Sequence, residues 1–149
     1  MCFFIRVYTY ACAPLRFADF GLPVVSDVVG EFAGPLAGIL TGMNWAQANV
    51  PGAEWVVSFA TDAPFLPTDM VGRFMAAVEE RKADIVCAVS NKQAHPVFAL
   101  WPLRLKDELK AAMIDEEMRK IDRWTARYRT AHVNFDYVDG DLDPFFNVN

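Results

Sequence analysis

An aspartate at the end of an apolar run is the first candidate for chemistry in this chain. Asp62 follows the mostly apolar residues 55–61 and precedes two prolines, Pro64 and Pro67. Such a run predicts a strand buried on both faces, whose last side chain lies at the sheet end where open α/β folds bind ligands. Asp62 is therefore a candidate ligand-binding carboxylate. The alternative is that it only closes the strand, by bonding backbone N–H groups in an Asx turn.

Asp27 and two glycines form a second candidate group. Asp27 ends a short apolar run at residues 22–27, which repeats the pattern of strand and carboxylate, although it could equally serve only to terminate its segment. Gly34 and Gly38 lie on either side of Pro35, which predicts the first position of a helix. Without Cβ atoms these glycines let another group approach the backbone, and the helix start favours an anion. The alternative for Gly38 is close packing of the helix against a strand.

Two further motifs carry weaker indications of chemistry. His95 precedes Pro96 at the start of a predicted strand, a place that favours a packed, hydrogen-bonded histidine over a catalytic base. The aspartates of residues 139–143 resemble calcium-loop spacing, but the glycine comes second and no glutamate follows, which excludes an EF-hand. We therefore expect these aspartates to lie in a solvated loop.

The elements that must position these residues alternate between strand and helix patterns. The order of strand, helix and strand across residues 55–90 predicts a right-handed parallel crossover. We therefore expect a single domain over residues 1–149, with a three-layer α/β fold, a mostly parallel sheet and helices on both faces. Strand patterns cover residues 4–10, 55–61, 84–90, 95–101 and 132–138, and the last of these is expected on a partly exposed face or edge. Helix patterns cover residues 34–43, a segment after Pro67, and two consecutive helices within 102–129.

Composition excludes several classes of protein. With 149 residues, 54% of them hydrophobic and 22% charged, the chain fits one globular domain and not a disordered one. The net charge of -5 and the scattered Lys and Arg argue against nucleic-acid binding. No apolar run reaches the length of about 18 residues that spans a membrane, and the start lacks the pattern of a signal peptide. Cys2, Cys12 and Cys87 have neither metal-type spacing nor an even count, so we expect a reducing cytoplasm.

An ordered set of motifs resembles the molybdenum cofactor guanylyltransferase family, which makes molybdopterin guanine dinucleotide from GTP. Each motif is weak alone, whereas their common order is specific. The resemblance covers residues 14–149, fits residues 1–12 poorly, and implies a nucleotide-diphospho-sugar transferase-like, Rossmann-like fold. The motifs are Asp27, GPLAG (34–38), TDAPFLP (61–67), HPVFALW (95–101) and FNVN (146–149).

The resemblance implies a role for each candidate residue. It makes Asp62 the catalytic carboxylate that holds Mg²⁺, a hard cation bound through one or two carboxylates plus substrate phosphates. The implied reaction is attack of the molybdopterin phosphate on the α-phosphate of GTP, which releases pyrophosphate and depends on positioning and charge neutralisation. The nucleotide would contact Asp27, Gly34, Gly38 and Asp62, and molybdopterin would contact Asn147 and Asn149.

The chain departs from the family pattern at its start. The family begins with a strand and a glycine-rich loop whose Arg and Lys cradle the triphosphate, whereas the residues before Phe20 offer only Arg6 and Arg16 and no glycine. We therefore expect an N-terminally incomplete domain with impaired guanylyltransferase activity. One alternative is a non-catalytic fragment that binds molybdopterin or a protein partner, such as a molybdoenzyme or a cofactor-biosynthesis protein. Another is a cytidylyltransferase of the same cofactor. Missing strands would leave an exposed sheet edge open to self-association.

Overall fold

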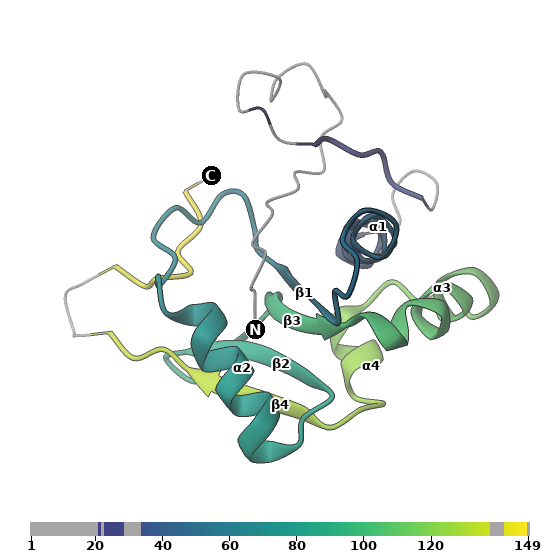
Figure 1. The fold of residues 1–149 in the computed structure, drawn as a ribbon. Helices are drawn as coiled ribbons and strands as arrows, with labels where there is room; N and C mark the ends of the chain where they lie inside the picture. Colours follow the sequence, from purple (N-terminus) through teal and green to yellow (C-terminus); the bar gives the residue numbers. More distant parts are fainter. Residues whose placement is uncertain (1–20, 22, 29–33, 138–141, 149) are drawn as a thin grey trace.

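A mixed sheet forms the centre of the computed structural model, which describes residues 21, 23–28, 34–137 and 142–148 (Figure 1). Within these residues the strand order is β1-β3-β2-β4. β3 pairs antiparallel with both of its neighbours, and β2 pairs parallel with β4, so three of the four strands share one direction. The strands are β1 (Trp55–Ser58), β2 (Ile85–Ser90), β3 (Gln93–Pro102) and β4 (Thr130–Asn134).

A tight hairpin joins β2 to β3. Its two turn residues, Asn91 and Lys92, have φ angles of 45° and 64°. Positive φ at both positions is the geometry of the turn that matches the twist of antiparallel strands. Gln93 pairs with Ser90, so two residues separate the strands instead of the four that lie between the strand patterns at 84–90 and 95–101, and β3 begins earlier than expected.

Helices cover both faces of the sheet, which confirms the predicted three-layer α/β fold. α1 (Pro35–Asn49), α3 (Lys106–Asp115) and α4 (Ile121–Thr125) pack on one face, and α2 (Met70–Arg81) packs on the other (Figure 1). The 3-10 turn η2 (Leu103–Leu105) connects β3 to α3. Pro35 occupies the start of α1, where its missing N–H costs no helical hydrogen bond.

Alternation along β3 supplies two hydrophobic cores. Ala99 and Trp101 enter the core beneath α1, α3 and α4, whereas Phe98 and Leu100 enter the core beneath α2. Successive side chains of a strand point to opposite faces, so one strand serves both layers.

Within the described part of the chain, no helix has both the length and the apolar character needed to cross a bilayer.

Three predicted strands differ from the observed structure. β1 ends at Ser58 and not at residue 61, so Asp62 lies in the loop beyond the strand. β1 is also half-buried along its whole length instead of buried on both faces, because β3 is its single described neighbour. Residues 23–27 form neither helix nor strand, and β4 ends at Asn134. The strand expected at residues 4–10 lies outside the described residues.

Candidate functional site

The structure brings Asp62 into contact with the C-terminal segment, defined here as residues 142–148. Asn147 Nδ2 donates a hydrogen bond to Asp62 Oδ2 at 2.7 Å, and Val148 N donates to the Asp62 carbonyl oxygen at 2.9 Å. In Figure 1 this yellow segment runs beside the teal loop that follows β1. The residue expected to hold the metal therefore touches a residue expected to contact molybdopterin. Asn149 lies outside the described residues.

The carboxylate of Asp62 suits a magnesium ion that arrives with phosphate ligands. No group of three or more His, Cys, Asp or Glu side chains in the described ranges could hold a metal by itself. Mg²⁺ usually binds through one or two carboxylates and completes its shell with water and substrate phosphates. The hydrogen bond from Asn147 orients the carboxylate, as supporting groups around metal ligands commonly do.

Asp27 is held on α1 by a threonine hydroxyl. Thr41 Oγ1 lies 3.2 Å from Asp27 Oδ1 and 2.8 Å from the carbonyl oxygen of Ala37, so these two acceptors share one hydroxyl proton. Thr41 Oγ1 also accepts a hydrogen bond from Val28 N at 3.1 Å. Burial raises the pKa of Asp27, and the hydrogen bond with Thr41 offsets part of this effect. Asp27 is thus a partly buried carboxylate fixed to α1.

The two glycines near the start of α1 have different structural needs. Gly34 precedes the helix with a φ angle of 71°, a conformation that favours glycine, and an added Cβ would lie 3.5 Å from the carbonyl oxygen of Arg119. Gly38 is helical, and no described atom outside its own helix lies within 4 Å of the position of an added Cβ. Close packing against a strand therefore does not explain Gly38 within the described structure. No described side chain outside α1 would be displaced by a group placed beside Gly38.

Alanine substitutions should separate these two glycines by stability. Gly38→Ala is expected to stabilise the protein by about 0.5–1 kcal/mol, because alanine favours a helix interior and meets no described neighbour. Gly34→Ala is expected to destabilise it by about 1–2 kcal/mol, because an L-residue is strained at positive φ. Urea unfolding of both variants measures the difference. A destabilised Gly38→Ala variant would show that the helix is closely packed there.

His95 is packed and hydrogen-bonded, as expected from its place in the sequence. Its Nε2 atom lies 2.7 Å from Ser90 Oγ, and its ring centroid lies 4.7 Å from that of Phe145. Burial lowers the pKa of His95, and the negative charge of Asp143 offsets part of this effect. The ring is therefore neutral at pH 7, and its Nε2 atom is already bonded to Ser90.

The lowered pKa of His95 predicts a pH-dependent stability. As the pH falls below about 6.5, the ordinary histidine pKa, the unfolded chain takes up a proton that the folded chain resists. The free energy of unfolding should therefore fall between about pH 7 and pH 5, and His95→Gln should flatten this part of the curve. Urea unfolding at several pH values tests the slope. If the free energy of unfolding depended on pH in the same way in the wild-type protein and in His95→Gln, the lowered pKa of His95 would be contradicted.

Sequence reasoning missed two residues that hold the C-terminal segment. Ser90 Oγ lies 2.6 Å from Asp143 Oδ2, so Asp143 is bound to the sheet and is not part of a solvated loop as predicted. Asp139 and Asp141 lie outside the described residues. The available signals were slight, namely a serine that ends the apolar run of β2 and an aspartate before the sequence PFF.

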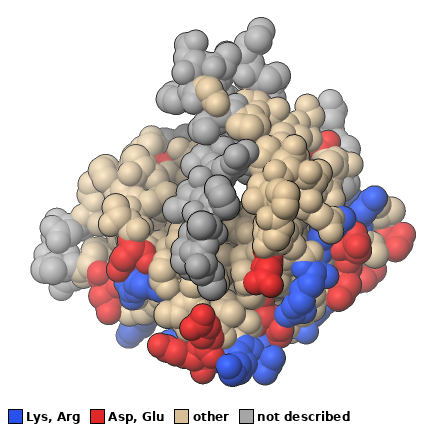
Figure 2. Space-filling model, in the orientation of Figure 1, with Lys and Arg blue, Asp and Glu red and all other residues tan. Residues whose placement is uncertain are grey.

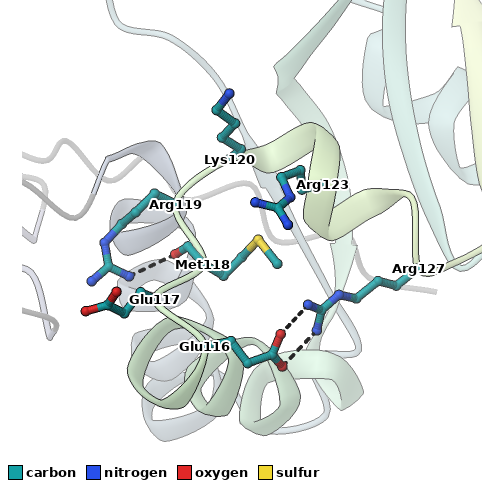
Figure 3. Close-up of a pocket in the computed structure, with 7 residues that line it drawn as sticks. All are labelled: Glu116, Glu117, Met118, Arg119, Lys120, Arg123 and Arg127. Carbon is teal, nitrogen blue, oxygen red and sulfur yellow. Dashed lines mark hydrogen bonds and ion pairs between the residues drawn. The ribbon is translucent and has the colours of Figure 1, made fainter.

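A separate hollow of about 230 Å³ lies at the connection between α3 and α4 (Figure 3). Glu116 and Arg127 form an ion pair on one side, and Arg119 donates to the carbonyl oxygens of Met113 and Met118 on the other. Figure 2 shows that charged side chains gather in the lower half of the face drawn, with both signs interleaved. The hollow shares no lining residue with the site at Asp62. Its lining consists of Glu116, Glu117, Met118, Arg119, Lys120, Arg123 and Arg127.

Similar folds occur in two solved structures. A protein of Aquifex aeolicus VF5 superposes with a TM-score of 0.71 at 16% identity, covering 95% of this chain and 70% of that protein. Molybdopterin-guanine dinucleotide biosynthesis protein A of Archaeoglobus fulgidus superposes with a TM-score of 0.58 at 20% identity, covering 80% of this chain and 56% of that protein. At these identities the likeness establishes the fold.

Sequence relatives establish the family. The molybdenum cofactor guanylyltransferase of Nitrobacter hamburgensis is 52% identical over 136 residues, and that of Rhodopseudomonas palustris strain BisB5 is 49% identical over 136 residues. Each alignment covers 91% of this chain, which spans 64% of the length of either relative. A family model described as the MobA-like NTP transferase domain matches residues 4–132. The resemblance found in the sequence is therefore confirmed, and the chain belongs to the MobA-like NTP transferase family.

Proposed function

We propose that this chain carries the site for magnesium-dependent transfer of GMP from GTP to molybdopterin. The observation that carries the proposal is the contact between Asp62 and Asn147, which are 85 residues apart in the sequence and joined by a 2.7 Å hydrogen bond. Family membership supports the reaction class, and the curated relatives are called molybdenum cofactor guanylyltransferases. Residues assigned to the metal and to the acceptor substrate thus lie side by side, as transfer between two bound substrates requires.

The reaction joins two anionic groups, so charge is its main obstacle. An oxygen of the molybdopterin phosphate forms a bond to the α-phosphorus of GTP, and the bond from that phosphorus to the bridging oxygen breaks. Pyrophosphate leaves with the electron pair. When bound, Mg²⁺ supplies charge neutralisation and polarises the phosphate oxygens. No proton has to be removed from the acceptor phosphate, so the site needs no general base.

The protein's part in this reaction is to bind and orient. Asp62 would hold the metal, with its carboxylate fixed by the amide of Asn147. The open space beside Gly38, together with Gly34 at the start of α1, would admit the nucleotide. Asp27, held by Thr41 on the same helix, would line the nucleotide site. Preorganised groups of this kind accelerate phosphoryl transfer without forming bonds to the substrate.

Pyrophosphate release tests the proposal directly. The full chain is incubated with molybdopterin, Mg²⁺ and either GTP or CTP, and pyrophosphate is measured over time. We expect release that needs both substrates, stops when EDTA removes the metal, and is faster with GTP than with CTP. Release that is faster with CTP would assign the chain as a cytidylyltransferase, and no release with either nucleotide would contradict the proposed activity.

A further inference from the structure

A buried serine connects the sheet to the C-terminal segment. Ser90 is the last residue of β2, and its side chain is 0% exposed. Its hydroxyl lies 2.6 Å from Asp143 Oδ2 and 2.7 Å from His95 Nε2. These partners come from the C-terminal segment and from β3, so three separate parts of the chain meet at one hydroxyl group.

The single hydroxyl proton fixes the direction of both hydrogen bonds. An ionised carboxylate only accepts hydrogen bonds, so Ser90 donates its proton to Asp143. The oxygen of Ser90 must then accept from His95, which places the histidine proton on Nε2. The order Asp143, Ser90, His95 differs from a nucleophilic triad, in which histidine accepts the serine proton. Full burial also denies Ser90 access to a substrate, so the chain of hydrogen bonds is structural.

Asp143 shapes the turn that follows it. Its Oδ1 atom accepts a hydrogen bond from Phe145 N at 2.8 Å, and its carbonyl oxygen accepts from Phe146 N at 2.9 Å. One carboxylate therefore binds the sheet through Oδ2 and its own turn through Oδ1. This double attachment sets both the place and the direction of the residues that follow.

An aromatic contact reinforces the same attachment. Phe145 is 5% exposed, and its ring centroid lies 4.7 Å from His95, 4.8 Å from Phe98 and 5.5 Å from Phe135. His95 thus contacts the segment directly through the ring of Phe145 and is linked to it a second time through the hydroxyl group of Ser90. Two residues beyond Phe145, the side chain of Asn147 reaches Asp62.

We propose that Ser90, His95 and Asp143 are positioning residues that hold the C-terminal segment on the sheet so that Asn147 meets Asp62. The catalytic part of this inference rests on the proposed function, whereas the structural part does not. The three residues do not touch the substrates. Their hydrogen bonds fix the position of Asn147, which would contact molybdopterin, relative to the carboxylate of Asp62, which would hold the metal. Loss of these hydrogen bonds should weaken the binding and use of molybdopterin and leave nucleotide binding in place.

The central variant is Ser90→Ala, with Ser58→Ala as its matched control. Ser58 is likewise the last residue of a strand, and its hydroxyl bonds to Trp101 Nε1 at 2.8 Å and to the carbonyl oxygen of Val97. These partners lie on β3, so Ser58→Ala disturbs the sheet without touching the C-terminal segment. Asp143→Asn is the conservative companion, because its one amide oxygen can accept from Phe145 N while its NH2 group donates to the oxygen of Ser90, which then donates its own proton to His95 Nε2.

Amide hydrogen exchange of the full-length chain provides the first readout. In Ser90→Ala the protection of the Val148 amide is expected to fall at least about tenfold relative to core amides such as that of Val86. Ser58→Ala should change the two amides in proportion, and Asp143→Asn should retain most of the wild-type protection at Val148. Unchanged relative protection of Val148 in Ser90→Ala would overturn the proposal, whether or not the chain is an active enzyme.

Steady-state kinetics provide the second readout. Ser90→Ala is expected to raise the KM for molybdopterin by about tenfold or more while changing the KM for GTP less than about twofold. A proportional loss with both substrates would assign Ser90 a general structural role and overturn the positioning role. If the wild-type chain shows no transfer, the proposed function fails, and the exchange of the Val148 amide alone decides the structural inference.

Discussion

Asp62→Ala is expected to reduce magnesium-dependent transfer by about 10²–10³-fold, the effect of removing one preorganised group that stabilises charge. The loss should come mainly from metal and nucleotide binding, because the variant removes the carboxylate that would hold Mg²⁺. The fold should persist, since Asp62 lies in a partly exposed loop between β1 and α2. Pyrophosphate release and urea unfolding measured on the same preparation separate the two effects.

Two further variants sharpen the test of Asp62. Asp62→Asn keeps an oxygen that can accept from Asn147 and removes the charge, so it should be nearly as inactive as Asp62→Ala. Asp69 supplies the control from the same loop, because its exposed carboxylate forms an ion pair with Arg73 at 3.8 Å. Asp69→Ala should keep wild-type activity. Full activity in Asp62→Asn would refute the metal-binding role.

Trp101→Ala should have the largest effect on stability, a loss of about 3–5 kcal/mol. The indole is 1% exposed in the core beneath α1, α3 and α4, so truncation leaves a large cavity. The variant also removes the hydrogen bond from Trp101 Nε1 to Ser58 Oγ at 2.8 Å. Urea unfolding, with comparison of the midpoints and slopes, measures the loss.

Trp101→Phe divides this loss into packing and hydrogen bonding. Phenylalanine fills much of the space but cannot donate to Ser58, so we expect a smaller loss, which includes about 1 kcal/mol for the missing hydrogen bond. If Trp101→Ala lost less than Trp101→Phe, or less than about 1 kcal/mol, the indole would not fill the core as the structure places it.

Local signals in the sequence predicted all four α-helices and the approximate places of the four strands in the described part of the chain, but not the bounds of every strand. Pro35 marked the start of α1, and apolar spacing after Pro67 marked α2, because both signals depend on neighbouring residues. The neighbours of a strand depend on distant parts of the chain. The insertion of β3 between β1 and β2 was therefore not predicted, although the α/β class and the shared direction of β1 and β2 were. The half-buried state of β1 follows from the same strand order.

At the candidate site, too, local patterns predicted single residues, whereas contacts between distant residues were not predicted. An apolar run before Asp62 indicated a strand end, and the family resemblance supplied its role and that of Asn147. The contact between them joins residues 85 positions apart, a distance that no local pattern encodes. Ser90 and Asp143 were missed for this reason, because each is unremarkable within its own segment. Their hydrogen bond becomes visible only when β2 and the C-terminal segment lie together.

Calorimetric titration of the chain with GTP tests the central claim, that Asp62 organises a magnesium–nucleotide site. We expect saturable binding that requires Mg²⁺, is lost in Asp62→Asn and is retained in Asp69→Ala. Absence of binding at millimolar GTP with Mg²⁺, or equal affinity in the wild-type protein and Asp62→Asn, would contradict it.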